Sequence, residues 1–358
     1  MVNPKVIYMH SNNDASADIM HRERVQIAKN IGIDIEELRM QDHFDVARSC
    51  RNIDSLYKKK DLRLLRFYEY LEKKFNNKDV LIHFGGAGLH KKFLERIKLL
   101  KIFHFADDPD STNQISKRVA NYYDIQAISN PTCIPNYLNF GCKNVFFWPL
   151  GAQFYRDDNL NFESNILPFT KRNPELLFIG DRFGIPKYRG VEKLKKALKL
   201  LKVRKELSFL YKKKGFFQEI ESKELKVNGY GNGWDNGFCS TIKAIELYKN
   251  YMFGINIHNS SGPINFRLYD LAAFGVCQFC DCKNTLDFVF KDGKEIIGYS
   301  SADELVDLYY FYFKHKSLAE KIANNARKRY LKEYTSMNLW KKLNKYVKNF
   351  TGINLIPK

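Results

Sequence analysis

Short apolar runs alternate with longer amphipathic stretches through the first part of the chain. Each run is short enough for one β-strand, and the runs lie at residues 5–9, 79–84, 101–106, 125–129 and 145–148. Between them, residues 56–75 repeat Leu, Tyr and Phe at helical spacing, which is typical of a helix with one buried face. Strands that alternate with helices favour a doubly wound α/β domain with a parallel sheet. We therefore predict a first Rossmann-like domain over residues 1–155.

The same alternation resumes after a polar segment that has no sustained period. We interpret residues 156–173 as an interdomain linker. Beyond it we expect strands at 176–179, 208–211 and 226–229, a Leu/Lys helix at 191–201, and helices at 302–315 and 318–334. A second Rossmann-like domain would then span residues 174–335, with parallel sheets of the two domains facing across a cleft. Residues 336–358 would form a basic helix or tail that packs back on the first domain or lies on an anionic membrane.

The stretch 255–281 contains one complete unit of strand, loop, helix and strand. An apolar strand at 255–257 leads into a Ser/Gly/Pro loop, and a helix opens at Asn265 and stops at a glycine before the next apolar strand. Asn265, Arg267 and Asp270 then lie together at a helix N-terminus, where backbone N–H groups and the helix dipole favour an anion. This suits a phosphorylated, hydroxylated ligand. An ordinary i,i+3 surface pair between Arg267 and Asp270 fits the spacing equally well.

A second candidate site is the loop that follows the strand at 176–179. Gly180 opens this loop, and Arg182, Lys187 and Arg189 supply cations that could neutralise a diphosphate leaving group. A solvated basic loop is the ordinary alternative.

Three carboxylates and two histidines lie at predicted strand ends of the first domain. They are Asp14, Asp107, Asp108, His10 and His83. A carboxylate or an imidazole in this position can act as the general base that deprotonates an acceptor hydroxyl. Capping or turn formation is the alternative for each aspartate, since Asp beside Pro is common in turns.

Two further patterns point less strongly to a site. Residues 85–88, Gly-Gly-Ala-Gly, have neither the spacing of a dinucleotide fingerprint nor the Lys-Ser/Thr of a P-loop, so close packing explains them. Cys277, Cys280 and Cys282 suggest a metal ion, but zinc needs a fourth ligand. Cys280 and Cys282 also share one strand face, as buried thiols would. We expect no metal site and no cofactor.

Composition narrows the classes of function. The chain has 358 residues, of which 44% are hydrophobic and 28% charged, as in a folded protein, and its formal net charge is +19. Such a charge suits nucleic acid, an anionic membrane surface or phosphorylated small molecules. No recognised nucleic-acid module accompanies it, and many of the lysines fall at spacings typical of solvated helix faces.

Three features of the sequence indicate the cellular compartment of the protein. No apolar run approaches the ~20 residues of a membrane-spanning helix, and the N-terminus lacks a signal-peptide pattern. The seven scattered cysteines suit a reducing environment. We expect a cytoplasmic protein, with peripheral association at the inner membrane surface as an option.

Several segments resemble the spore-maturation (CgeB-like) glycosyltransferases, relatives of the glycogen-synthase-type and family-1 transferases. The matching residues are Asn265-Phe-Arg-Leu-Tyr-Asp-Leu-Ala-Ala-Phe-Gly275 between two apolar strands, His104-Phe-Ala-Asp-Asp-Pro109, Phe178-Ile-Gly180, Gly229-Tyr-Gly231 and the run 291–305. The resemblance covers most of residues 80–335 and is stronger in the second half. It implies a GT-B fold, in which two Rossmann-like domains face each other and the second holds the nucleotide sugar.

The resemblance also implies roles for single residues. Asp270 stands where relatives hold the donor ribose, Arg267 lies near the donor diphosphate, and Arg182 and Lys187 stand where relatives place diphosphate-binding cations. Separately from the resemblance, we expect Tyr230 or Trp234 near the base. The first Glu of the relatives' pattern is Gly262 here, and the second is the shorter Asp270, so a retaining outcome does not carry over. Nucleotide-sugar binding is thereby assigned to Gly180, Arg182, Lys187, Tyr230, Asn265, Arg267 and Asp270.

We therefore predict a metal-independent, hexosyltransferase-like enzyme that moves a sugar from a nucleotide-sugar donor to an acceptor hydroxyl of a surface glycan, glycolipid or protein. It would stabilise the departing diphosphate, and one of Asp14, Asp107, Asp108 or His83 would deprotonate or position the acceptor. A nucleic-acid-binding protein and a non-catalytic nucleotide-sugar-binding paralogue are the alternatives. The donor sugar, its base, the acceptor and the stereochemical outcome stay open.

Overall fold

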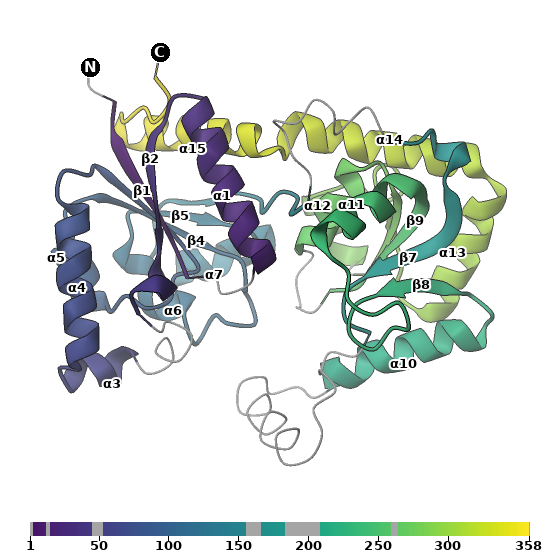
Figure 1. Cartoon of the computed structure of the whole chain (residues 1–358), viewed down its shortest axis with the longest axis horizontal. Coiled ribbons are helices and arrows are strands. Elements are labelled where there is room, and N and C mark those ends of the chain that lie inside the picture. The colour runs from purple at the N-terminus through teal and green to yellow at the C-terminus, as the bar shows by residue number, and fades with distance from the viewer. Residues whose placement is uncertain are drawn as a thin grey trace. The chain divides into compact units, whose positions relative to one another are not determined.

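The computed structural model describes residues 3–11, 15–44, 53–154, 166–182, 208–258, 264–281 and 283–357, with backbone only for 15–19 and 208–214. The chain forms two compact units, each with its own sheet (Figure 1). Unit 1 is Met1–Gln153 with Glu333–Lys358, and unit 2 is Phe154–Lys332. Some sequence predictions lie outside the described residues: the helix at 191–201, Asp14, Lys187, Arg189, Gly262 and Cys282.

Unit 1 contains a six-stranded sheet in the order β2-β1-β3-β4-β5-β6. Every neighbouring pair in it is parallel. The chain moves from β1 outward to β2 and then crosses to β3 on the other side of β1, which is the strand order of a doubly wound sheet. The strands are β1 (Lys5–His10), β2 (Asp34–Arg39), β3 (Val80–Phe84), β4 (Leu100–Phe105), β5 (Ile125–Ile128) and β6 (Val145–Phe147).

Helices cover both faces of this sheet, which explains why its central strands β1, β3, β4 and β5 are buried along almost their whole length. Figure 1 shows α4 and α5 on one side of the sheet and α1 and α15 on the other. Asp61 caps α4 by accepting hydrogen bonds from the backbone of Arg63 and Leu64. The helices are α1 (Ala15–Asn30), α3 (Ile53–Lys58), α4 (Leu62–Phe75), α5 (Lys91–Arg96), α6 (Ser116–Val119), α7 (Ile134–Asn139) and α15 (Ser336–Thr351).

The C-terminal helix α15 is part of unit 1. Trp340 Nε1 donates to the carbonyl of Arg24, and Trp148 Nε1 donates to the carbonyl of Leu339, both at 2.9 Å. One face of the helix is buried, with Leu339, Trp340, Leu343 and Val347. This apolar face is therefore used for packing within unit 1.

Unit 2 contains a five-stranded parallel sheet in the order β11-β10-β9-β7-β8. Its strands are β7 (Asn173–Ile179), β8 (Val227–Tyr230), β9 (Tyr251–Asn256), β10 (Cys277–Cys280) and β11 (Ile297–Gly298). The helices are α10 (Ser208–Ser222), α11 (Thr241–Asn250), α12 (Phe266–Ala273), α13 (Ala302–Lys314) and α14 (Lys316–Glu333). Two α/β units with parallel sheets confirm the predicted fold class.

Two predicted elements differ from the structure. The helix expected over 56–75 is divided into α3 and α4. Residues 208–211, expected as a strand, form the first turn of α10. Later in the same helix Phe217 and Ile220 are buried three positions apart, which is helical spacing. A run of four residues is too short to distinguish strand from helix, so the longer period decides. None of the described helices is both long and apolar enough to span a bilayer.

Candidate functional site

A pocket of about 530 Å³ opens at the carboxyl ends of β7 and β8 in unit 2. Residues 179–181 and the glycine-rich loop 230–239 line it. Ligands of parallel α/β sheets bind at this edge, because strand ends and helix N-termini meet there. Gly180 and Tyr230, both predicted from the sequence, lie in its wall.

Trp234 forms a fixed wall of this pocket. Its side chain packs against Phe217 with ring centroids 4.9 Å apart, and its Nε1 donates to the carbonyl of Gly180 at 2.9 Å. A Cβ at position 229 would lie 2.0 Å from the indole, so the ring covers a position that only glycine can fill. Trp234 is therefore mainly a core residue, and of the two aromatics expected near a base, Tyr230 is the more exposed.

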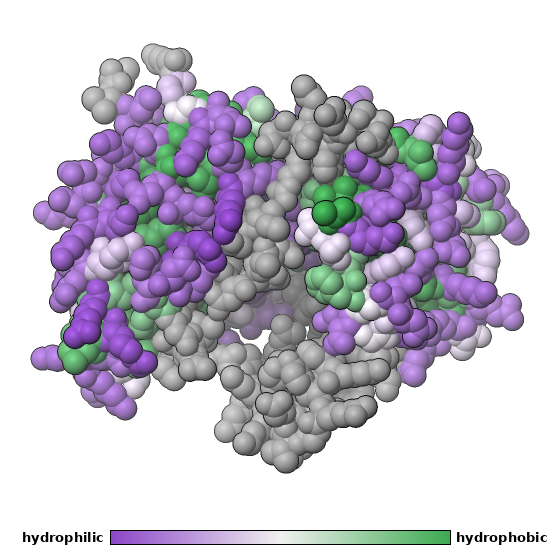
Figure 2. Space-filling view, in the orientation of Figure 1, coloured by the Kyte–Doolittle hydropathy of each residue, from purple (hydrophilic) through white to green (hydrophobic). Residues whose placement is uncertain are grey.

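Phe238 is an aromatic residue of the pocket that sequence reasoning missed. It is 89% exposed although it lines the cavity. Figure 2 shows a hydrophobic patch among hydrophilic residues over the neighbouring helix α11, which carries the exposed Ile242. The sequence signal that could have identified Phe238 is a large aromatic side chain in a loop of Gly, Asn and Asp, a position where burial does not explain an aromatic residue.

Arg267 holds its guanidinium across the ends of two strands. Its Nε donates to the carbonyl of Ile179 at 2.8 Å, and its Nη1 donates to Asn256 Oδ1 at 3.2 Å. The group also lies 4.4 Å from the centre of the Phe178 ring. Burial lowers the pKa of Arg267 from its usual value, while Tyr248, Asp270, Asp281 and Cys280 act in the opposite direction. The result is a positioned cation rather than a mobile one.

Gly180 is required by the position of Arg267. A Cβ on residue 180 would lie 2.4 Å from Arg267 Nη2, and the backbone φ of +151° is also unfavourable for other residues. Gly180 and Arg267 therefore fit together at the edge of the pocket, because a glycine leaves room for the guanidinium.

Asn265 caps α12, at the helix start that the sequence predicted. Its Oδ1 accepts the N–H of Leu268 at 2.9 Å, and its Nδ2 donates to Asn256 Oδ1 at 2.7 Å. Asn256 is fully buried at the end of β9. The amide pair fixes the N-terminus of α12 to the sheet, so that the positive end of the helix dipole lies beside Arg267.

The structure places two other predicted residues differently. Asp270 is 1% exposed, and its Oδ1 accepts the N–H of Phe154 at 2.8 Å, so its carboxylate anchors the chain that enters unit 2. Arg182 pairs with Glu221 of α10, and its guanidinium lies 4.7 Å from the centre of the Trp234 ring. Both charges therefore have structural partners, which their sequence neighbourhoods did not reveal.

The two candidate aspartates described in unit 1 differ in their exposure to solvent. Asp107 is exposed, whereas Asp108 is buried. The Asp108 carboxylate accepts hydrogen bonds from Thr112, Ser116 and Tyr137, the last at 2.6 Å. Burial raises the pKa of Asp108 and these donors lower it. Asp108 thus organises its loop, and Asp107 is the aspartate that faces solvent.

The histidines of the same unit are parts of its core. His83 is fully buried, and its Nδ1 lies 2.6 Å from the hydroxyl of Tyr123. Burial lowers the pKa of His83 to about 3, so it is a poor base at neutral pH. His10 is fully buried as well, with its Nε2 2.9 Å from Glu37. The expectation that His83 serves as the base therefore conflicts with its surroundings.

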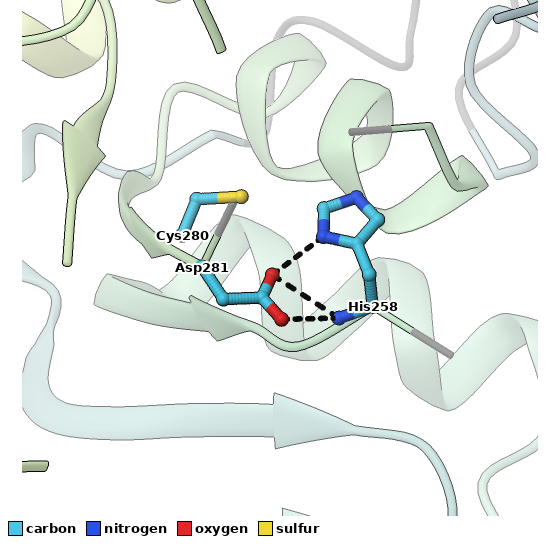
Figure 3. A group of neighbouring side chains, drawn as sticks. All are labelled: His258, Cys280 and Asp281. Carbon is cyan, nitrogen blue, oxygen red and sulfur yellow. Dashed lines mark hydrogen bonds and ion pairs between the residues drawn. The ribbon is translucent and has the colours of Figure 1, made fainter. Parts of the chain in front are cut away.

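A second group missed from the sequence lies at the ends of β9 and β10. His258 Nδ1 is 2.5 Å from Asp281 Oδ1, and the His258 backbone N–H donates to the same carboxylate (Figure 3). Asn256 and Cys280 are partners in the parallel register, which brings the residues just after them together. The polar residue that follows each apolar strand was the available signal.

A family model describes part of the chain. Residues 205–345 match a model described as "Glycosyl transferase-like". This segment is less than half of the 358 residues and includes most of unit 2. No curated protein sequence matches the chain.

Solved structures match almost the whole chain. Anabaena HepE in complex with UDP-glucose has a TM-score of 0.59 at 10% identity, covering 96% of this chain and 99% of that one. Sucrose-phosphate synthase from Thermosynechococcus elongatus has 0.60 at 11%, covering 97% and 99%. A glycosyltransferase from Rickettsia africae has 0.58 at 14%, covering 98% and 99%. The chain therefore has the GT-B fold, and the partial family match is consistent with a GT-B glycosyltransferase.

Proposed function

We propose that the chain is a glycosyltransferase of the spore-maturation type, which transfers a sugar from a nucleotide-sugar donor to an acceptor hydroxyl. The observation that supports this most is the arrangement of Arg267 beside the pocket at the ends of β7 and β8. A fixed cation, a helix N-terminus and a glycine-rich loop together suit a diphosphate. An exposed aromatic side chain in the same pocket suits a nucleobase.

In this proposal unit 2 binds the donor. Tyr230 and Phe238 flank the base, and Arg267 with the N-terminus of α12 faces the diphosphate. As the bond between the sugar and the diphosphate breaks, negative charge grows on the leaving oxygen, and these groups stabilise it without a metal ion in the transfer step. Asp270 and Asn265 act by holding the pocket in place.

Unit 1 supplies the acceptor side. The acceptor oxygen forms the new bond to the sugar, and its proton passes to a base. Asp107 is the described candidate, since His83 is buried with a lowered pKa and Asp108 is engaged by three hydroxyl groups. The acceptor class that we propose is a surface glycan, glycolipid or protein, modified at the cytoplasmic side of the membrane.

Isothermal titration of the full chain with UDP, GDP and ADP tests the donor site. We expect one of these to bind, and Arg267→Ala to weaken that binding by about tenfold or more. The exposed Arg96→Ala of unit 1 is the matched control and should bind normally. If none of the three nucleotides binds, or if Arg267→Ala binds as well as the wild type, the assignment is wrong.

Gly180→Ala tests the same arrangement without removing a charge. The new methyl group displaces Arg267, so nucleotide affinity should fall while the net charge stays the same. Gly293→Ala is the control, because its φ is +71° but nothing lies within 4 Å of the added atom. A transfer or hydrolysis assay with the bound donor then separates an enzyme from a non-catalytic nucleotide-sugar-binding protein.

A further inference from the structure

Three potential metal ligands of different types converge where β9 and β10 end. They are His258, Cys280 and Asp281, and one ligand atom from each lies within 4.8 Å of the other two (Figure 3). His258 is 1% exposed and Cys280 is fully buried. Three such side chains from two neighbouring strands define a small site with one partly open side, at Asp281.

The two ring nitrogens of His258 have different surroundings. Its Nδ1 is 2.5 Å from Asp281, whereas its Nε2 is buried without a hydrogen-bond partner among the described residues. Nδ1 is the ring nitrogen that faces Asp281, so it is the atom that would bind an ion together with the carboxylate and the thiol sulfur (Figure 3).

The geometry leads us to propose that His258, Cys280 and Asp281 bind one divalent transition-metal ion of the Zn²⁺ type. An imidazole nitrogen, a thiolate and a carboxylate oxygen are the ligands that Zn²⁺ takes in proteins. The thiolate favours Zn²⁺ or Co²⁺ over Mg²⁺ and Ca²⁺, which prefer oxygen ligands alone. Three protein ligands leave a fourth position for water or another ligand. The sequence had directed attention to Cys277, Cys280 and Cys282, but Cys277 packs in the unit 2 core.

The site lies beside Arg267. The guanidinium bonds to Asn256, two residues before His258, and to the carbonyl of Ile257, which directly precedes it. Asp281 attracts this guanidinium electrostatically. A bound divalent cation would add positive charge near Arg267, which strengthens the attraction of the neighbouring pocket for an anion.

Metal and nucleoside diphosphate should consequently favour each other's binding. The ion is not part of the transfer step; it modulates affinity from beside the pocket. The coupling between metal and nucleotide rests on the proposed function, whereas the metal site itself does not. Because linkage is reciprocal, either ligand can be used to detect the coupling.

Titration of the full chain with Co²⁺ tests the site without any nucleotide. We expect a thiolate-to-cobalt charge-transfer absorption that saturates at one ion per chain and disappears when Zn²⁺ is added. Cys280→Ser should abolish the absorption, and Asp281→Asn and His258→Gln should weaken Co²⁺ binding by about tenfold or more. Cys277→Ser, a buried thiol on the same strand, is the matched control and should leave the absorption intact.

Two outcomes would overturn the metal site. One is the absence of the charge-transfer absorption in the wild type. The other is an unchanged absorption in Cys280→Ser, which would place the cobalt on other cysteines. Circular dichroism of each variant distinguishes loss of the site from loss of the fold.

Titration with UDP, GDP and ADP, with Zn²⁺ and with a chelator, tests the coupling. We expect the nucleotide that binds to do so on the order of fivefold more tightly with Zn²⁺, and Cys280→Ser to lose this difference. The Cys280→Ser protein also controls for complexes between Zn²⁺ and nucleotide in solution. Equal affinities in both conditions would overturn the coupling. Absence of all nucleotide binding would overturn the proposed function, while the cobalt absorption would still decide the metal site.

Discussion

At the scale of single residues, the pocket of unit 2 combines fixed side chains with one free aromatic group. Trp234 and Arg267 are held by hydrogen bonds to the carbonyls of Gly180 and Ile179. Phe238 is 89% exposed and has room to move onto a ligand. Rigid partners around one adaptable aromatic ring are suited to holding a diphosphate in place while a flat base stacks.

Phe238→Ala should therefore weaken nucleotide binding without affecting the fold. Loss of one stacked base is worth about 1–3 kcal/mol, so affinity should fall by roughly fivefold to 150-fold. Ile242→Ala is the control, since Ile242 is 80% exposed on α11 but does not line the pocket. Titration calorimetry and thermal melting of both variants provide the measurement. Equal affinities for the two variants would exclude Phe238 from the base site.

At the scale of elements, α15 completes the core of unit 1. Trp340 packs edge-on to Trp148 and Tyr8, with ring centroids 5.9 and 6.3 Å apart, and bonds to the backbone of α1 at Arg24. One buried indole thus joins a C-terminal helix to the first strand and the first helix.

Trp340→Ala should destabilise the protein by about 3–5 kcal/mol, because it opens a large cavity and leaves the Arg24 carbonyl without its donor. Phe350→Ala on the same helix removes a ring that is 47% exposed and should cost far less. Urea unfolding followed by circular dichroism measures both free energies. Similar losses for the two variants would show that α15 does not depend on this contact.

The central strands of unit 1 also make the protein sensitive to acid. Burial lowers the pKa of His83 and His104 to about 3, and that of His21 in α1 well below its usual value. The folded state therefore binds fewer protons than the unfolded state below pH about 6.5. The stability that this gives is present above pH about 6.5 and is lost as the pH falls toward 3.

Each of these histidines should contribute a slope of up to about 1.4 kcal/mol per pH unit in that range. His83→Gln should reduce the slope by up to about 1.4 kcal/mol per pH unit, because a glutamine takes up no proton on unfolding. Urea unfolding between pH about 7 and 4 measures the slopes. Equal slopes for wild type and His83→Gln would show that His83 takes up its proton without unfolding.

At the scale of the whole molecule, the formal net charge of +19 distinguishes two classes of ligand. Nucleic acid would contact many lysines at once, so its affinity should fall by 10³ to 10⁵ between about 50 and 200 mM salt. A nucleoside diphosphate has only two phosphates, and in the proposed site it would contact the half-buried Arg267. We expect its affinity to change by less than about tenfold over that range. Titrations at several salt concentrations with UDP and with single-stranded DNA compare the two, and a steep loss of UDP binding would contradict the pocket described above.

Much of the fold and part of the site followed from local patterns. Strand and helix periods placed two parallel α/β units, because a buried sheet and its covering helices repeat their apolar positions over short distances. The start of α12 at Asn265 was recognisable, since the signals for a helix start span only a few residues. The strand predicted at 208–211 was wrong, because four residues are too few to show a period.

Only the tertiary structure decided which side chains are buried and which residues from distant segments meet. Arg267 bonds to Ile179, 88 positions away, and Asp270 to Phe154, 116 positions away. His258 meets Cys280 and Asp281 only because β9 and β10 are neighbours in the sheet. Burial turned His83 and Trp234 from candidate site residues into core residues. These outcomes depend on desolvation and on contacts far apart along the chain, neither of which a local pattern contains.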